Sequence, residues 1–323
     1  MIQPPELKLD LSMKLANGAV STTTKVWEVL SASHRGDIER VRELGDECPE
    51  LLYAQYNYAP PIQFAVREGH AELVRFLLDN EAHDPEYKFY PFQESLQTVA
   101  ADRGFDAIVA MLDEYQRGSK GTKFRGDNGE IMYDRSDLEQ EFERAVYESD
   151  LERTEQILKV HPELATGDTY FWSEGILVFP AKENNRPMID LLMSYGAKVP
   201  KLLKWTQFYY FERLDAATYI MEKGMDPNTM SWQHVTILHD MAQKGFIDKA
   251  ELLIKHGADL NPIDEAYQST PLGLAARWGN AEMVEFLLDQ GADPDASGAD
   301  WSTPLAWAQK KGHRGIERIL QGR

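Results

Sequence analysis

Glycines recur at a nearly constant distance along this chain and mark the same point of a repeated pattern. Near the carboxyl end they are Gly245, Gly279 and Gly312, which follow one another after 34 and 33 residues. Near the amino end, Gly36 and Gly69 are 33 residues apart. A fixed period of this length is typical of solenoids, in which each repeat packs only against its neighbours. The period therefore predicts a stack of short repeats rather than a globule with one central core.

Each repeat contains two short apolar runs with helical spacing. Met283, Phe286 and Leu287 illustrate the i, i+3, i+4 pattern of one such run. Thr270, which is followed by proline, fits the capped start of a helix, and Gly291 fits a helix end in the left-handed conformation. A pair of such helices cannot bury its apolar stripe alone. We therefore expect neighbouring pairs to stack and to share one continuous core.

The repeated motif resembles that of the ankyrin family. Residues 269–293, STPLGLAARWGNAEMVEFLLDQGAD, combine T-P-L, A-A-x-x-G and L-L-x-x-G-A-D. The resemblance implies an all-α ankyrin-repeat solenoid of about nine helix-turn-helix units over residues 24–323. Residues 1–23 would be an N-terminal extension or cap. The resemblance also assigns His239 to backbone hydrogen bonds between repeats, and it implies a recognition or scaffold protein that binds a protein segment on its concave face.

An insertion interrupts the period at about residues 115–137. Within it, an Asp-Asn-Gly sequence lies between Thr122–Arg125 and Glu130–Tyr133, which predicts a β-hairpin with a tight turn. Insertions in repeat proteins often lie on the binding face, although a tolerated surface loop explains this one equally well.

The middle of the chain is irregular. Ser149 stands where the pattern has glycine, and Gly224 follows Gly196 after only 28 residues. We expect the stack to bend and its groove to narrow at this shortened repeat.

The charge and the cysteine content limit the classes of function. The chain has 53 acidic and 34 basic residues and a net charge of −19, which disfavours nucleic acid and anionic membranes as partners. The single cysteine, Cys48, excludes an internal disulfide framework. Motifs for metal or nucleotide binding are missing, so we expect no cofactor and no metal. With no long apolar run and no signal-like start, the expected location is the cytoplasm.

Aromatic and polar residues recur at positions that the ankyrin resemblance places on the concave surface. Tyrosine and tryptophan give a large contact area at low entropic cost, so they often anchor interfaces. The same residues can instead fill gaps in a degenerate core. We predict a binding surface made of Tyr170, Trp172, Trp205, Tyr210, Trp232, His234, Tyr267, Gln268, Arg277, Trp278 and Trp301.

Three carboxylates support an alternative function. Asp240 occupies a place where the next two repeats have Leu274 and Trp307, and a buried carboxylate has a raised pKa, as a general acid requires. Glu174 and Glu212 lie on neighbouring repeats, and two carboxylates beside tryptophans would resemble a glycosidase site. The alternative is therefore a hydrolase, or a binder of a small polar ligand such as a sugar, with a pocket at repeats five to seven.

Overall fold

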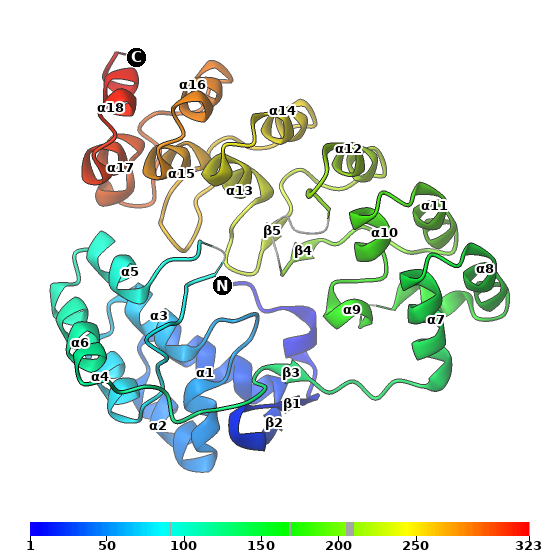
Figure 1. Cartoon of the computed structure of the whole chain (residues 1–323), viewed down its shortest axis with the longest axis horizontal. Helices are drawn as coiled ribbons and strands as arrows, with labels where there is room; N and C mark the ends of the chain where they lie inside the picture. The colour runs from blue at the N-terminus through cyan, green and yellow to red at the C-terminus, as the bar shows by residue number, and fades with distance from the viewer. Residues whose placement is uncertain (91, 168, 205–209, 323) are drawn as a thin grey trace. The chain divides into compact units, whose positions relative to one another are not determined.

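A computed structural model describes residues 1–90, 92–167, 169–204 and 210–322 (Figure 1). The chain forms two compact units. Unit 1 consists of Met1–Ile2 and Arg135–Arg323, and unit 2 consists of Gln3–Asp134. The division between Asp134 and Arg135 falls near the end of the insertion. The next helix, α7, begins at Asp137. The predicted single repeat domain over residues 24–323 stays a prediction.

Unit 2 contains three helix pairs, each with a left-handed turn between its two helices. The turn residue after α1 is Gly36, with φ 73°, and the turn residue after α3 is Gly69, with φ 81°. The pairs are α1 (Thr23–Arg35) with α2 (Ile38–Glu47), α3 (Pro61–Glu68) with α4 (Ala71–Asp79), and α5 (Leu96–Asp102) with α6 (Asp106–Arg117). Short 3-10 helices η1 (Pro5–Lys8), η2 (Ala16–Gly18) and η3 (Pro49–Tyr53) complete its helical elements.

A small sheet corrects the expected hairpin of the insertion. Its strands are β1 (Ser12–Lys14), β2 (Val20–Thr22) and β3 (Glu130–Ile131), in the order β2-β1-β3. The strand β3 therefore pairs antiparallel with β1, and no strand includes Thr122–Arg125. Two further contacts join the N-terminal extension to the segment before β3. Lys14 pairs with Asp127 at 2.8 Å, and the Gly129 N–H donates to the Lys14 carbonyl at 2.9 Å.

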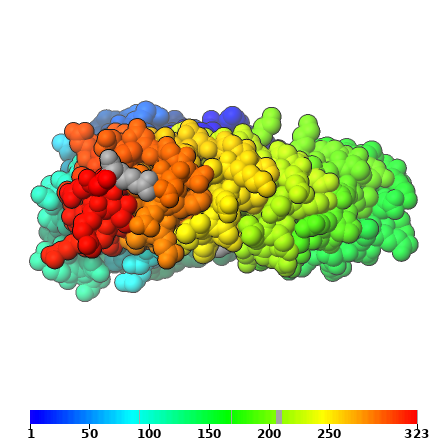
Figure 2. All heavy atoms as spheres, turned by 90° about the horizontal axis from the view of Figure 1, so that it is seen from above, coloured from blue at the N-terminus to red at the C-terminus, as the bar shows by residue number. Residues whose placement is uncertain are grey.

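Unit 1 carries the remaining repeats, which follow one another in chain order from green to red (Figures 1 and 2). The inner helices α13, α15 and α17 pack side by side, and α14, α16 and α18 form a second layer. Its helices are α7 (Asp137–Tyr147), α8 (Leu151–Val160), η4 (Pro162–Thr166), α9 (Tyr170–Ser173), α10 (Val178–Lys182), α11 (Arg186–Ser194), α12 (Leu214–Glu222), α13 (Ile237–Lys244), α14 (Ile247–Lys255), α15 (Pro271–Trp278), α16 (Ala281–Asp289), η5 (Asp300–Ser302), α17 (Pro304–Lys311) and α18 (Arg314–Gln321).

Side chains from one repeat complete the helix end of the repeat before it. The amide of Asn280 donates to the carbonyls of Ala242 and Gln243, at 3.0 and 2.6 Å. One repeat further along, the His313 ring lies 3.2 Å from the carbonyl of Arg277, which belongs to the repeat before it. The last carbonyls of a helix have no partner within the helix. The stacking of repeats therefore rests on polar bonds as well as on apolar contact.

Hairpin loops precede the inner helices α3, α5, α13 and α15, and their tips share one backbone feature. The tip residue lies two positions before the N-cap and is left-handed without being glycine. In unit 2 the tips are Tyr58 and Gln93, and in unit 1 they are His234 and Gln268. The short strands β4 (Leu202–Leu203) and β5 (Met230–Ser231) pair in parallel beside the His234 loop.

Candidate protein-binding surface of unit 1

The tips of unit 1 are tied to one another by main-chain hydrogen bonds. The Glu265 N–H donates to the Gln233 carbonyl at 3.3 Å, and the Gly298 N–H donates to the Gln268 carbonyl at 2.7 Å. Each bond joins the loop of one repeat to the loop of the next. The tip side chains therefore stand on a connected backbone rather than on independent loops.

Beside the tips, the Arg277 guanidinium is enclosed by aromatic rings. It lies 4.2 Å from the ring centre of Tyr267, 4.1 Å from that of Trp278 and 5.1 Å from that of Trp307. Trp301 meets Trp307 edge to face at 5.6 Å, and the Trp307 indole N–H donates to the Ser269 hydroxyl at 2.7 Å. Such cation–π contacts gain strength when they are desolvated, as Arg277 is at 4 % exposure.

Two lysines lie beside this cluster although the whole chain is acidic. Lys310 and Lys311 lie over the Trp307 ring at 5.7 and 5.8 Å, and Lys244 ends the inner helix α13. The corresponding ends of α7 and α10 are followed instead by the exposed acids Glu148 and Glu183. The residue just before the left-handed turn is thus acidic after α7 and α10 and basic at the ends of α13 and α17.

The structure separates the eleven predicted binding residues into buried and accessible groups. Buried are Tyr170, Tyr210, Trp232, Tyr267 and Arg277; partly exposed are His234, Gln268, Trp278 and Trp301; Trp172 is exposed; Trp205 lies outside the described residues. The buried members support the surface rather than present their own side chains on it.

An aromatic turn in the irregular repeats is strained. Phe171, Trp172 and Ser173 are left-handed in succession, with φ of 48°, 58° and 63°. The Phe171 ring packs against Phe179 at 4.6 Å, and the Tyr147 ring packs against Phe179 at 5.0 Å. Left-handed residues other than glycine cost energy and often mark functional segments. The Trp172 side chain is 67 % exposed, so this turn presents an indole to the outside of unit 1.

The three candidate catalytic carboxylates have different surroundings. Glu174 is buried, and its charge raises the pKa of Tyr210, second to the effect of burial on that phenol. Glu212 is exposed, and its carbonyl accepts a hydrogen bond from the Lys249 ammonium at 2.9 Å. A catalytic pair requires two carboxylates that face each other across a substrate. The assignment of these three residues to catalysis stays a prediction.

Asp240 is the buried acid that its place in the repeat predicts. It is 1 % exposed, and Leu274 and Trp307 at the equivalent places are fully buried. Burial raises the pKa of Asp240 to about 6, and the ammonium groups of Lys244 and Lys249 oppose this rise. The Lys244 ammonium lies 3.4 Å from its carboxylate. The ion pair therefore offsets only part of the cost of burying this charge.

His239 has the structural role that the repeat motif implies. Its Nδ1 lies 2.8 Å from the Thr236 hydroxyl, and its Nε2 lies 3.0 Å from the Ser269 carbonyl of the next repeat. Burial lowers its pKa, which favours the neutral ring. The predicted role of His239, a backbone hydrogen bond between repeats, is confirmed. Two further surface residues, Glu265 and Lys310, were not among the predicted binding residues, since neither belongs to the aromatic pattern.

Metal sites and membrane-spanning helices are two further classes of feature to consider. The described residues contain no group of three or more His, Cys, Asp or Glu side chains arranged to hold a metal ion. In the same part of the chain, no helix combines the length and the apolar character needed to cross a bilayer.

Comparison with known proteins identifies the family of the repeats. A family model described as ankyrin repeats (3 copies) matches residues 207–298 and 238–322. Cyclin-dependent kinase 4 inhibitor B of Bos taurus is 32 % identical over 109 residues, which are 34 % of this chain and 82 % of that protein. Palmitoyltransferase ZDHHC13 of Mus musculus is 31 % identical over 124 residues, which are 38 % of this chain but only 20 % of the enzyme.

A third relative, ARF GTPase-activating protein Git of Drosophila melanogaster, is 37 % identical over 84 residues, or 26 % of this chain and 12 % of that protein. The names of these relatives describe different activities, so what they have in common with this chain is the repeat itself. The repeated left-handed turns, the stacked helix pairs and these matches lead to one conclusion: the chain belongs to the ankyrin-repeat family.

Proposed function

We propose that the chain is a protein-recognition module that binds an acidic, extended segment of a partner on unit 1. The contact surface, here called the inner surface, consists of Lys244, Gln268, Trp278, Trp301, Lys310 and Lys311. Ankyrin repeats imply a protein-binding scaffold. The observation that carries the choice of face is the Arg277 cluster, where Trp278 and Trp301 are partly exposed and Lys310 and Lys311 of α17 lie over the buried Trp307 ring.

The physical argument combines contact area with charge. Trp278 and Trp301 offer apolar area that is already held in place, because Trp278 packs on Tyr267 and Trp301 packs on Trp307. A rigid aromatic anchor loses little entropy on binding, and tryptophan and arginine dominate the energetics of interfaces. The lysines then select an acidic partner, which the net charge of −19 would repel elsewhere.

The alternative, a sugar-binding or hydrolytic pocket with Glu174, Glu212 and Asp240, is favoured by one observation, the pKa of about 6 at Asp240. The burial of Asp240 and Trp232 speaks against direct contact with a sugar. A thermal-shift screen of sugars against the full chain tests this alternative. A hit that Asp240→Asn abolishes would support the pocket, and no stabilisation by any sugar would contradict it.

The main proposal is tested by affinity capture from lysate with the full chain and matched variants. Lys310→Glu reverses a charge on the inner helix α17, and Arg314→Glu reverses one on α18 of the same repeat. We expect Lys310→Glu and Trp301→Ala to reduce the amount of a captured protein about tenfold or more, while Arg314→Glu changes it by less than about twofold.

Circular dichroism of each variant shows whether the fold is kept. Capture that is lost equally with Lys310→Glu and Arg314→Glu would indicate a general charge effect. Capture that survives Trp301→Ala and Trp278→Ala would place the binding site on another face.

A further inference from the structure

The insertion of unit 2 carries a short basic segment on an acidic chain. Residues 117–125, here called the basic strap, have the sequence RGSKGTKFR, which contains four basic residues and no acidic one. They begin at the last residue of α6 and run toward β3 (Figure 1). All four basic residues, Arg117, Lys120, Lys123 and Arg125, are exposed. The strap therefore presents positive charge to solvent, although the whole chain has a net charge of −19.

Alternate residues hold the second half of the strap on unit 2. Thr122 and Phe124 are buried, at 5 % and 3 % exposure. The Phe124 ring stacks on the Tyr53 ring, with 5.4 Å between the ring centres. Between these two buried residues, the Lys123 N–H donates to the Glu81 carbonyl at 3.3 Å. The main chain is therefore fixed, while the side chain of Lys123 stays exposed.

Two further places along the strap are tied to other elements of unit 2. The Tyr115 hydroxyl donates to the Gly121 carbonyl at 3.0 Å. The Arg125 N–H donates to the Asn17 side-chain oxygen at 2.9 Å, and the Asn17 N–H donates to the Arg125 carbonyl at 2.6 Å. None of these bonds uses a basic side chain. A ligand of the basic side chains would therefore meet a strap that is already ordered, which lowers the entropic cost of binding.

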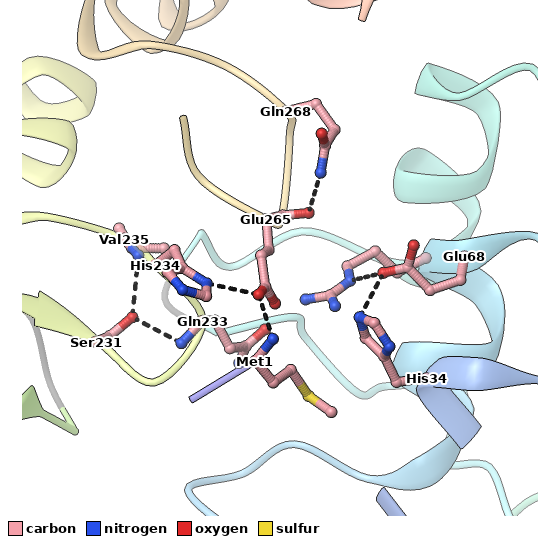
Figure 3. A network of polar contacts seen from close by, with 10 residues as sticks. Met1, His34, Glu68, Ser231, Gln233, His234, Val235, Glu265 and Gln268 are labelled. Carbon is pink, nitrogen blue, oxygen red and sulfur yellow. Dashed lines mark hydrogen bonds and ion pairs between the residues drawn. The ribbon is translucent and has the colours of Figure 1, made fainter. Parts of the chain in front are cut away.

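Ionisable side chains elsewhere in the chain lie beside a partner of opposite character. Figure 3 shows one contact between an imidazole and a carboxylate in each unit, His34 with Glu68 at 3.7 Å and His234 with Glu265 at 2.5 Å. Lysines and arginines on the helices of unit 2 form ion pairs with acids in the same way. These pairs are Lys25 with Glu47, Arg40 with Glu28, and Arg75 with Glu114.

The basic strap differs from these helices in its partners. Within the described residues, none of its four basic side chains forms an ion pair with a carboxylate. The contacts that two of them make are to neutral groups. Arg117 donates to the Asp113 carbonyl at 3.2 Å, and the Lys123 ammonium lies 5.4 Å from the centre of the Phe124 ring.

The acidic residues that border the strap in sequence are engaged with other bases. Glu114, the first acid before the strap, pairs with Arg75 at 3.5 Å. Asp127, the first acid after it, pairs with Lys14 at 2.8 Å. The charge of the strap is therefore not neutralised by its neighbours along the chain.

We propose that the basic strap is a docking site for a short acidic segment of a partner protein. Charge interactions fade over about 8 Å at physiological ionic strength. A peptide confined to the strap is therefore attracted by its four bases, whereas a nucleic acid or an anionic membrane would also meet the acidic remainder of the chain. The strap lies in unit 2 and includes no residue of the inner surface, so this site does not depend on the proposed function.

The test measures binding of a fluorescent peptide amide, GEEGEEG, by anisotropy. Its glutamine counterpart GQQGQQG keeps the length and removes the charge. The protein is the full chain carrying Lys310→Glu and Lys311→Glu, which removes basic groups of the inner surface from the measurement. We expect the glutamate peptide to bind about tenfold more tightly than the glutamine peptide, because only carboxylates complement the strap.

The informative variant combines Lys123→Gln with Arg125→Gln, which removes two exposed charges and leaves the buried Thr122 and Phe124 in place. We expect it to weaken binding of the glutamate peptide about tenfold. The matched control combines Lys25→Gln with Arg40→Gln, which removes the same number of charges from paired bases of unit 2. We expect this control to change the affinity by less than about twofold. Circular dichroism checks the fold of each variant.

Three outcomes would overturn the proposal. The first is equal affinity for the glutamate and glutamine peptides. The second is an equal loss of affinity in the two double variants, which would indicate a general charge effect. The third is tighter binding of a single-stranded thymidine oligonucleotide or of phosphatidylserine vesicles than of the glutamate peptide. None of these outcomes bears on capture that depends on Lys310 and Trp301, so the proposed function of unit 1 is judged separately.

Discussion

The regular and the irregular repeats of unit 1 form the same left-handed turn with different residue types. In the regular repeats α13–α18, the left-handed turn residue is glycine, as at Gly279 with φ 81°. In the irregular repeats α7–α11, Ser149 and Asn184 adopt the same conformation with φ of 60° and 55°. The packing of neighbouring repeats therefore imposes the turn, and glycine only lowers its energy. The repeats that lack glycine are also those with the exposed Trp172 and the short helix α10.

The largest expected effect comes from removing glycine where the stack is regular. An added Cβ at Gly279 would lie 2.8 Å from the His313 ring, in addition to the left-handed strain. We expect Gly279→Ala to lower the free energy of unfolding by about 3 kcal/mol, measured by urea denaturation. Gly257→Ala is the matched control, since its turn is equally left-handed but its Cβ would meet nothing within 4 Å. Equal losses in both variants would show that contact with His313 is unimportant.

The second effect concerns Asp240, which stands at the border of the two regions and depends on pH. The pKa of this carboxyl is about 6 in the folded chain and 3.8 as its ordinary value. Both states are protonated at low pH, and the unfolded state ionises first as pH rises. The contribution of Asp240 to stability is therefore present below pH 3.8 and lost by pH 6.

Asp240→Asn removes this pH dependence. Relative to the natural chain, we expect its free energy of unfolding to rise by about 2–3 kcal/mol between pH 3.5 and 7. Glu251→Gln on the outer helix α14 should give a flat difference over the same range. If the stability difference between Asp240→Asn and the natural chain is also independent of pH, the pKa of the Asp240 carboxyl is not raised in the folded chain.

A smaller effect compares the stability given by a hydrogen bond between repeats with that given by a hydrogen bond within a helix. Asn280 makes no cap bond in its own helix and donates only to the preceding repeat, so Asn280→Ala tests stacking. We expect a loss of about 1.5 kcal/mol in urea unfolding, because two helix-end carbonyls each lose a donor. Asn185→Ala in the irregular region removes only a cap bond to the Met188 N–H at 3.2 Å, with an expected loss of about 1 kcal/mol. A smaller loss for Asn280 than for Asn185 would reverse the comparison.

The smallest effect has the opposite sign. Glycine at position 149 would relieve the left-handed strain at an exposed site without removing a packed side chain. We expect Ser149→Gly to raise the free energy of unfolding by about 0.5 kcal/mol, since the relief exceeds the entropy that glycine adds to the unfolded chain. Differential scanning calorimetry measures it, and destabilisation would show that the strain is already relieved by local contacts.

Periodic features of the fold were accessible from the sequence. The glycine period and the threonine caps located the helix pairs, because turn conformation and helix capping depend on a few adjacent residues. His239 and Asp240 could be interpreted by comparison with the equivalent places of other repeats. The partner of β3 could not be predicted, since β1 lies more than a hundred residues away in the chain.

The accessible surface was harder to predict than the fold. Trp232 and Trp301 both lie in the loop before an inner helix, yet one is buried and the other is partly exposed. Burial depends on how far the next loop covers each ring, and no local pattern contains that information. The contact between Met1 and Glu265 joins residues separated by 264 positions, and no repeat motif includes either of them.

The left-handed tips have a consequence for how such a chain can change. Tyr58, Gln93, His234 and Gln268 each hold a conformation that glycine would adopt at lower energy, by about 1 kcal/mol. A side chain at a tip thus lowers the free energy of unfolding, but it places a chemical group on a backbone that is the same in each loop. Because the backbone is the same whichever side chain is present, specificity can drift one tip at a time while the stack stays intact. Glycine at every tip would give a more stable protein with less to recognise.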